Sequence, residues 1–215
     1  IDSHQADISE LKTIKSAFEG QDVVVHLAAY LDSQDWEGNH AGNVLGAYNV
    51  FEASRQAGVK RVIFASSGSA VKGFESISPY KEITEGLYDD VPEGFPMIKH
   101  DQFWPDSLYG ATKIWGEVLG RHFSDHYDMS IICIRIGSVR PENRPLSIRE
   151  NAIYLGHYDV CQILRLCIDA PLSIKYDVFF AVSKNKWNYR DISHSKDVLG
   201  YEPHDSADGK FFMLS

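Results

Sequence analysis

Three short runs of apolar, mostly β-branched residues most constrain what this chain can fold into. They cover residues 22–29, 61–67 and 129–136. Runs of this length are typical of strands that are buried on both faces of a sheet. Segments with helical periodicity, at 43–56 and 108–127, separate these runs. The alternation predicts an α/β fold in which a doubly wound parallel sheet carries helices on both faces.

Shorter elements flank this alternation. Residues 68–108 show no clear period and hold four prolines, so we expect a long loop region there that covers a site. The remaining expectations are a helix at 8–18 that ends before Gly20, a helix at 159–170 with Asp159 as its N-cap, a strand at 177–182, and a helix at 193–199 that ends at Gly200.

Composition and charge exclude several classes of protein. The 215 residues carry a formal net charge of -9, and 44% of them are hydrophobic. An acidic balance argues against nucleic acid as a partner, because phosphate binding requires a basic face. No apolar run reaches the length of a membrane span, and the first residues lack the features of a signal peptide. Three cysteines without a CxxC pair indicate a reduced, cytoplasmic compartment.

Tyr109 and Lys113 are the first candidates for chemistry. They lie four residues apart at the start of the predicted helix 108–127, so they share one face of it. A phenol has a pKa near 10, and a neighbouring ammonium lowers that pKa. Tyr109 could then take a proton from a substrate hydroxyl, while Lys113 could also hold a ribose hydroxyl. Because such a pair arises readily by chance, its context matters: Ser66 and Ser67 end the preceding strand and add hydroxyls.

Four motifs, taken in order, resemble those of a known family. They are His26-Leu-Ala-Ala29, Asn43-Val-Leu-Gly-Ala-Tyr-Asn49, Phe64-Ala-Ser-Ser67 and Tyr109-Gly-Ala-Thr-Lys113. They look like the successive motifs of the extended short-chain dehydrogenases, the NAD-dependent epimerase/dehydratase family. The resemblance covers nearly the whole chain. It implies a Rossmann-like sheet, an oxidoreductase activity and NAD as cofactor, with NADP left open.

The resemblance also implies roles for individual residues. Ser67, Tyr109 and Lys113 would form a catalytic triad. Asp7 and Ile8 would border the adenine of the cofactor. The full set of residues implied to contact the cofactor is Asp7, Ile8, Leu27, Ala28, Ala29, Asn43, Ala65, Ser66, Tyr109, Lys113 and Ile136.

Within the family, the closest likeness is to the uronate dehydrogenases, which oxidise the anomeric carbon of a hexuronic acid with NAD. Arg135-Ile-Gly-Ser138, His157-Tyr-Asp159 and Asp191-Ile-Ser-His194 carry this likeness. Arg149 falls where that group places an arginine on the substrate carboxylate, which a guanidinium binds at two points. Arg144 is a weaker candidate for the same role. Ser69, Ser138 and Arg149 are therefore expected to contact a small sugar or sugar acid.

Two departures leave the substrate open. Gly68 and Ser69 stand where the uronate dehydrogenases have Asn-His, and Leu31 stands where they have a serine. The glycine-rich turn that grips the cofactor's pyrophosphate is also missing, since Gly38, Gly42 and Gly46 indicate close helix packing instead. We therefore expect an N-terminally incomplete dinucleotide-binding domain at 1–140, a small substrate-binding region at 141–215, and poor NAD binding by this chain alone.

Two other classes of function stay open. A nucleotide-sugar epimerase or dehydratase would use the same tyrosine and lysine but return the hydride, and a non-catalytic module could keep the fold alone. No metal site is expected, because His122 and His126 share a helix face without a third ligand. His26 is expected to be a core residue. A homo-oligomer is compatible with the sequence, and no membrane partner is expected.

Overall fold

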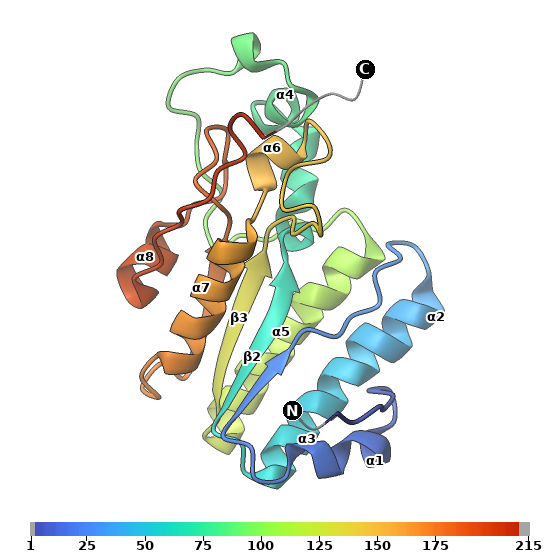
Figure 1. Ribbon diagram of the computed structural model, residues 1–215. Helices are drawn as coiled ribbons and strands as arrows, with labels where there is room; N and C mark the ends of the chain where they lie inside the picture. Colours follow the sequence, from blue (N-terminus) through green and yellow to red (C-terminus); the bar gives the residue numbers. More distant parts are fainter. Residues whose placement is uncertain (1–2, 211–215) are drawn as a thin grey trace. The chain divides into compact units, whose positions relative to one another are not determined.

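The computed structural model describes residues 3–210. Its four strands form one parallel sheet in the order β1-β2-β3-β4, and Figure 1 labels β2 and β3 of this sheet. In the register of the first pair, Val24 lies opposite Val62 and His26 lies opposite Phe64. The α/β fold with a parallel sheet is confirmed. The strands are β1 (Val23–His26), β2 (Arg61–Ser67), β3 (Ser130–Ile136) and β4 (Tyr176–Ala181).

Helical segments connect the strands. The α-helices are α1 (Leu11–Ile14), α2 (Trp36–Gly38), α3 (Gly46–Ala57), α4 (Tyr80–Glu85), α5 (Leu108–Tyr127), α6 (Glu150–Ile153), α7 (His157–Asp169) and α8 (Ser193–Leu199). The 3₁₀ segments are η1 (Lys15–Phe18), η3 (Gly68–Ser76) and η4 (Tyr88–Asp90), and η2 (Asn39–Leu45) is π-helical. Within residues 3–210 no helix combines the length and the apolar character that a bilayer crossing requires.

Residues 68–108 are less irregular than their sequence indicates. They hold η3, α4 and η4. Pro79 precedes α4 as its N-cap residue, and Gly86 ends that helix in the left-handed conformation with φ at 79°. Proline and glycine therefore mark the start and the end of a short helix here, and the segment is not one continuous loop. The expectation of one long loop region is wrong in this respect.

The contacts divide the chain into two compact units. Unit 1 contains residues 1–66, 107–134 and 170–178, and unit 2 contains residues 67–106, 135–169 and 179–215. The division follows no single point in the sequence, because the residues of β2, β3 and β4 are shared between the two units. The functional boundary at residue 140 stays a prediction from the sequence.

One face of the sheet in unit 1 is covered by α3 and α5. Alternate residues of β2 and β3 share a buried cluster with Phe51 of α3 and Phe123 of α5. The Phe51 ring centroid lies 5.8 Å from that of Phe64 and 5.5 Å from that of Phe123. The intervening residues Ile63 and Ile132 are also fully buried. The central strands are thus buried on both faces, as their uninterrupted apolar sequences predict.

Strand β1 departs from that prediction. Val25 is 37% exposed and Leu27 is 56% exposed, although both belong to an apolar run that predicts complete burial. Among the described residues β1 is an edge strand, with β2 as its one neighbour in the sheet. An edge strand has fewer packing partners, so its burial cannot be derived from its own composition.

The N-terminal half of α5 lies close against β2. The helix begins after Ser107, whose hydroxyl accepts the backbone N–H of Gly110 at 3.2 Å. A Cβ atom added at Gly116 would overlap the ring of Phe64. Glycine is therefore required at this position for the helix to approach the strand so closely. This contact fixes the distance between α5 and the sheet one helical turn after Lys113.

Unit 2 has its own core, which includes Val71, Ile83 and Phe180. The sequence predicts that Asp159 caps a helix, and this prediction is wrong. Helix α7 already begins at His157, so Asp159 lies inside its first turn. Its fully buried carboxylate accepts the hydroxyl of Ser183 at 2.6 Å and also accepts two backbone N–H groups from residues 204–205.

We expect Gly116→Val to destabilise the protein by about 1–3 kcal/mol, because the new side chain must displace Phe64 from a packed core. Urea unfolding followed by circular dichroism measures the difference. Ala111→Val places the same side chain at an exposed position of the same helix and should cost less than about 1 kcal/mol. Equal effects of the two substitutions would show that α5 does not depend on this close approach.

Candidate active site

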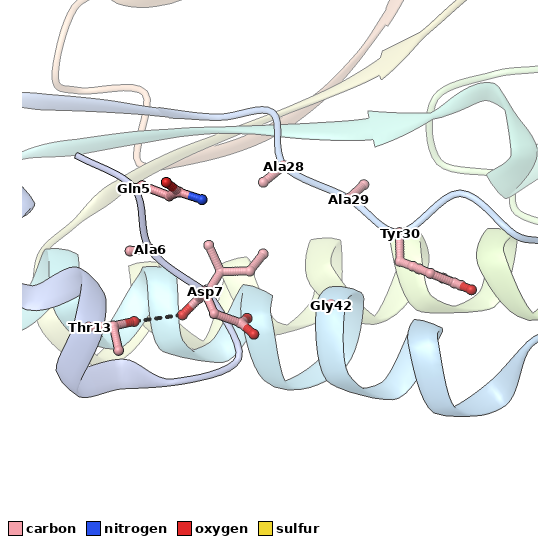
Figure 2. Close-up of a pocket in the computed structure, with 9 residues that line it drawn as sticks. Gln5, Ala6, Asp7, Thr13, Ala28, Ala29, Tyr30 and Gly42 are labelled. Atoms are coloured by element: carbon pink, nitrogen blue, oxygen red, sulfur yellow. Dashed lines mark hydrogen bonds between the residues drawn. The ribbon is translucent and has the colours of Figure 1, made fainter. Parts of the chain in front are cut away.

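An open pocket of about 700 Å³ lies in unit 1, next to the end of β1 (Figure 2). Parallel sheets commonly bind ligands beyond the carboxyl ends of their strands. Asp7, Ile8, Ala28 and Ala29, four residues predicted to contact the cofactor, line this pocket. Leu27 directly precedes two of them and is exposed. The structure thus brings together residues that lie about 20 positions apart in the sequence.

The same pocket has lining residues that the sequence analysis missed, namely Gln5, Ala6, Thr13, Tyr30 and Gly42. Thr13 donates its hydroxyl to the carbonyl of Asp7 at 2.8 Å (Figure 2). The carboxylate of Asp7 accepts the backbone N–H of Ser9 at 2.8 Å, and this bond lowers the pKa of Asp7. An aspartate that binds the backbone two residues later is a recognisable turn, and that signal could have indicated an ordered segment.

Asn43 holds the backbone at the edge of the pocket. Its side-chain oxygen accepts the N–H of Tyr30 at 2.8 Å, and its amide nitrogen donates to the carbonyl of Tyr30 at 2.9 Å. The same nitrogen donates to the side-chain oxygen of Asn39 at 2.9 Å. Both asparagines belong to the π-helical segment η2, a type of segment that is frequent at functional sites. Asn43 therefore positions the chain that follows Ala29.

The three spaced glycines pack closely, as their sequence context predicts. A Cβ atom at Gly38 would overlap the Tyr30 ring, and one at Gly42 would lie 3.0 Å from the Cβ of Tyr30. A Cβ at Gly46 would lie 2.7 Å from the side chain of Ile8. These glycines let η2 and α3 approach the two segments that form the pocket wall. The expectation of close helix packing is confirmed.

Tyr109 and Lys113 lie on the first turns of α5 in unit 1. The Nζ atom of Lys113 is 5.9 Å from the ring centroid of Tyr109. The two side chains therefore share one helix face, as the four-residue spacing predicts. In general, an ammonium close to a phenol favours the ionised form of that phenol.

The ammonium of Lys113 is almost completely buried. Its exposed fraction is 3%, and its Nζ lies 4.6 Å from the ring centroid of Phe64. Burial lowers the pKa of Lys113 to about 8, with weaker opposing contributions from Cys133 and Glu117. His26 lies in the same interior, where burial and the lysine's charge lower its pKa to about 3. His26 is therefore a neutral core residue at physiological pH, as expected.

Ser66 is turned to the interior of unit 1. Its hydroxyl donates to Oε1 of Glu117 at 2.5 Å, and both residues are buried. Glu117 lies one helical turn after Lys113 on α5, so the bond adds a polar link between the helix and β2. Ala65, which precedes Ser66, is also buried. The structure does not place either side chain in the pocket beside β1.

A second, smaller pocket of about 170 Å³ lies within unit 2. Ser67 is the N-cap residue of η3, and its hydroxyl oxygen accepts the backbone N–H of Ser69 at 3.1 Å. The structure brings together in this pocket the predicted residues Ser67, Ser69, Ile136, Ser138 and Arg149. All three residues predicted to contact the substrate thus line one cavity.

The second pocket also contains residues that were not predicted, namely Gly68, Gly137, Arg140, Glu150, Ile153 and Arg190. Arg140 donates to Glu150 at 2.9 and 2.5 Å. Arg149 donates to Glu75 through Nε at 2.5 Å and through Nη2 at 2.7 Å. Arg144 does not line this pocket. No local pattern in the sequence pairs these charges, so the sequence carried no signal for them.

Comparison with known proteins identifies the family. A model of the NAD dependent epimerase/dehydratase family matches residues 2–151, which is more than half of the sequence. This chain belongs to that family. The resemblance that its sequence motifs indicate is therefore confirmed.

Several of the relatives are dehydrogenases of sugars or sugar derivatives. The chain is 29% identical over 204 residues to an NAD-dependent glucose-6-phosphate dehydrogenase of Haloferax volcanii, an alignment that covers 94% of this chain and 75% of the relative. It is 31% identical over 204 residues to a uronate dehydrogenase of Agrobacterium fabrum, with coverage of 95% and 69%.

Solved structures agree with this family membership. The crystal structure of uronate dehydrogenase from Agrobacterium tumefaciens superimposes with a TM-score of 0.79 at 28% identity, covering 95% of this chain and 69% of the other. A mutant of that enzyme complexed with NAD superimposes with a TM-score of 0.78 at 27% identity, with the same coverage. The Rossmann-like sheet is confirmed.

The residues of the unit 1 pocket fit the family's cofactor. Ala28 and Ala29 have small side chains, so a dinucleotide can approach the main chain there. Ile8 offers an apolar surface for a base, and the carboxylate of Asp7 offers an acceptor for an amino group or hydroxyl. These residues would hold the adenosine part of NAD.

The buried ammonium of Lys113 predicts a pH-dependent difference in stability. Its pKa is about 8 in the folded protein against 10.5 ordinarily, so between these values the unfolded chain binds more protons. The free energy of unfolding therefore rises with pH in this range. From pH 7.5 to pH 10, the wild-type protein should gain roughly 2–3 kcal/mol relative to Lys113→Met in urea unfolding. A constant difference would mean that water reaches the ammonium in the folded protein.

Proposed function

We propose that this protein is an NAD-dependent sugar dehydrogenase that oxidises the anomeric C–OH of a small sugar or sugar acid, as the uronate dehydrogenases do. One observation carries the proposal: Tyr109 and Lys113 lie on one face of α5, with the ammonium buried and 5.9 Å from the phenol ring centroid. Family membership and the relatives that oxidise sugars or sugar phosphates support it.

In this proposal Tyr109 is the base. Its phenolate, stabilised by Lys113, takes the proton of the anomeric hydroxyl while the C–H bond at that carbon breaks with its electron pair. Bound NAD supplies the acceptor for the resulting hydride. The carbon is oxidised to the carbonyl level, which for a cyclic hexuronic acid is a lactone. Ser67, which lines the unit 2 pocket, is proposed as the third catalytic residue, as the family resemblance implies.

The proposal also assigns the cofactor to the unit 1 pocket. Asp7 and Ile8 border its adenine, and Ala28 and Ala29 border its phosphates and ribose. Asn43 acts as a positioning residue, because it holds the backbone of Tyr30 at the pocket's edge. NADP remains an alternative to NAD, since none of these residues discriminates a ribose hydroxyl from a ribose phosphate.

The size of the unit 2 pocket favours a free sugar over a nucleotide sugar. At about 170 Å³ it is smaller than the roughly 300–1,000 Å³ typical of pockets for larger ligands. An epimerase or dehydratase that acts on a nucleotide sugar would need additional space for the nucleotide. A cytoplasmic location and self-association stay predictions from the sequence.

Activity is best tested on this protein with galacturonate, glucuronate, glucose 6-phosphate and neutral aldoses, each with NAD and with NADP. We expect stoichiometric accumulation of reduced cofactor, followed by its absorbance. An epimerase or dehydratase would convert its substrate without net reduction of the cofactor. A binding module would bind a sugar or NAD and convert neither.

We expect Tyr109→Phe to lower the turnover number by about 10²–10⁴-fold, because the proton no longer has a positioned acceptor. NAD affinity, measured by calorimetry, should change little, since the ring remains. Tyr158→Phe is the matched control, because Tyr158 is 60% exposed on α7 in unit 2. Full turnover in Tyr109→Phe would contradict the assignment of the base.

A further inference from the structure

Three guanidiniums line the unit 2 pocket, and ion pairs with carboxylates account for two of them. Arg140 is paired with Glu150, and Arg149 is paired with Glu75. Glu75 also accepts the hydroxyl of Tyr189 at 2.5 Å, so both of its oxygens have partners. Arg190, the third guanidinium that lines the pocket, is attracted by the charge of Glu75 but forms no ion pair with either of these carboxylates.

Arg190 is also deeply buried. Its exposed fraction is 1%, and its Nε and Nη1 atoms are buried without a hydrogen-bond partner within residues 3–210. An arginine cannot lose its proton under ordinary conditions, so burial leaves a charge that must be compensated. Burial lowers the pKa of Arg190, which is the direction expected for a cation removed from water. An unbalanced, dehydrated guanidinium in a polar cavity indicates a negatively charged ligand.

Gly68 creates the space for this guanidinium. A Cβ atom added at Gly68 would overlap the guanidinium of Arg190. Ser67 and Ser69, which flank the glycine, line the same pocket. The guanidinium therefore lies directly against the backbone next to the serine that we propose as a catalytic residue.

We propose that Arg190 binds an anionic oxygen group of the substrate, a carboxylate or a phosphate, and so selects charged sugars over neutral ones. This inference rests on the proposed function for the identity of the ligand as a sugar. A guanidinium presents parallel N–H donors that match two oxygens of either group. Arg149 is less suited to this role in the structure, because two of its donors already bind Glu75.

The test compares glucose, glucuronate and glucose 6-phosphate, which differ only at C6. We expect the wild-type protein to have a kcat/KM at least about 30-fold higher for one of the two anions than for glucose. Arg190→Met should lower kcat/KM for that anion by about 30–1,000-fold, mainly through KM. The same substitution should change kcat/KM for glucose by less than about threefold. The kcat/KM of Arg190→Lys for that anion should lie between the values of the wild-type protein and Arg190→Met, because lysine keeps the charge but loses the two parallel N–H donors.

Three further variants separate anion binding from general damage. Gly68→Ala keeps the charge but displaces the guanidinium, so it should lower discrimination as Arg190→Met does. Arg149→Met should reduce discrimination less than Arg190→Met; the reverse order would overturn the assignment to Arg190. Arg121→Met removes an exposed guanidinium of unit 1 and should leave discrimination unchanged. Thermal unfolding identifies any variant that does not fold. If Arg190→Met does not fold, the discrimination measured for Arg190→Lys and Gly68→Ala decides whether Arg190 binds the anion.

The outcomes distinguish this inference from the proposed function. If glucose and both anions are oxidised equally well, and Arg190→Met leaves the ratios unchanged, the inference is overturned while the dehydrogenase assignment stands. If no sugar is oxidised, calorimetric titration of glucuronate, glucose 6-phosphate and inorganic phosphate tests the anion site alone. Binding of an anion that is lost in Arg190→Met supports the inference, and the absence of binding to the wild-type protein overturns it. Which anion binds identifies carboxylate or phosphate as the group recognised.

Discussion

The close contact between α5 and β2 is the constraint on which the candidate chemistry depends. Gly116 brings the helix against Phe64, and the same ring lies 4.6 Å from the ammonium of Lys113. The ring's face offsets part of the lost hydration, so a charged lysine can persist in the interior with a pKa of about 8. With a wider gap between helix and strand, water would reach the ammonium, and its influence on the Tyr109 phenol would weaken.

The two units tolerate buried positive charge by different means. Lys113 in unit 1 can release its proton, and its lowered pKa shows how burial favours the neutral form. Arg190 in unit 2 has no such option, because a guanidinium keeps its proton. A buried arginine must therefore find an anion, and the nearby Glu75 already serves Arg149 and Tyr189. With a pKa of about 8, Lys113 is still mostly charged at neutral pH and can stabilise a phenolate, whereas Arg190 keeps its charge at every ordinary pH and can hold an anionic ligand.

Local sequence signals predicted elements wherever the determining contacts were also local. Helix α5 spans the residues predicted, since Ser107 caps it, and α8 ends at Gly200 as expected. Prediction from the sequence failed where a residue's burial or role depends on a partner that is distant in the sequence. The exposure of Val25 depends on which strands flank β1, and the role of Asp159 depends on a serine 24 residues later.

The sequence by itself determined the four strands, the long helix α5 and the family. It also determined the pairing of Tyr109 with Lys113, because a four-residue spacing on a helix is a local geometric fact. Only the tertiary structure decided which charges are balanced. Gly68 and Arg190 lie far apart in the sequence, yet the absence of one side chain makes room for the other. Charge balance is a sum over all neighbours in space, and no local pattern of residues contains that sum.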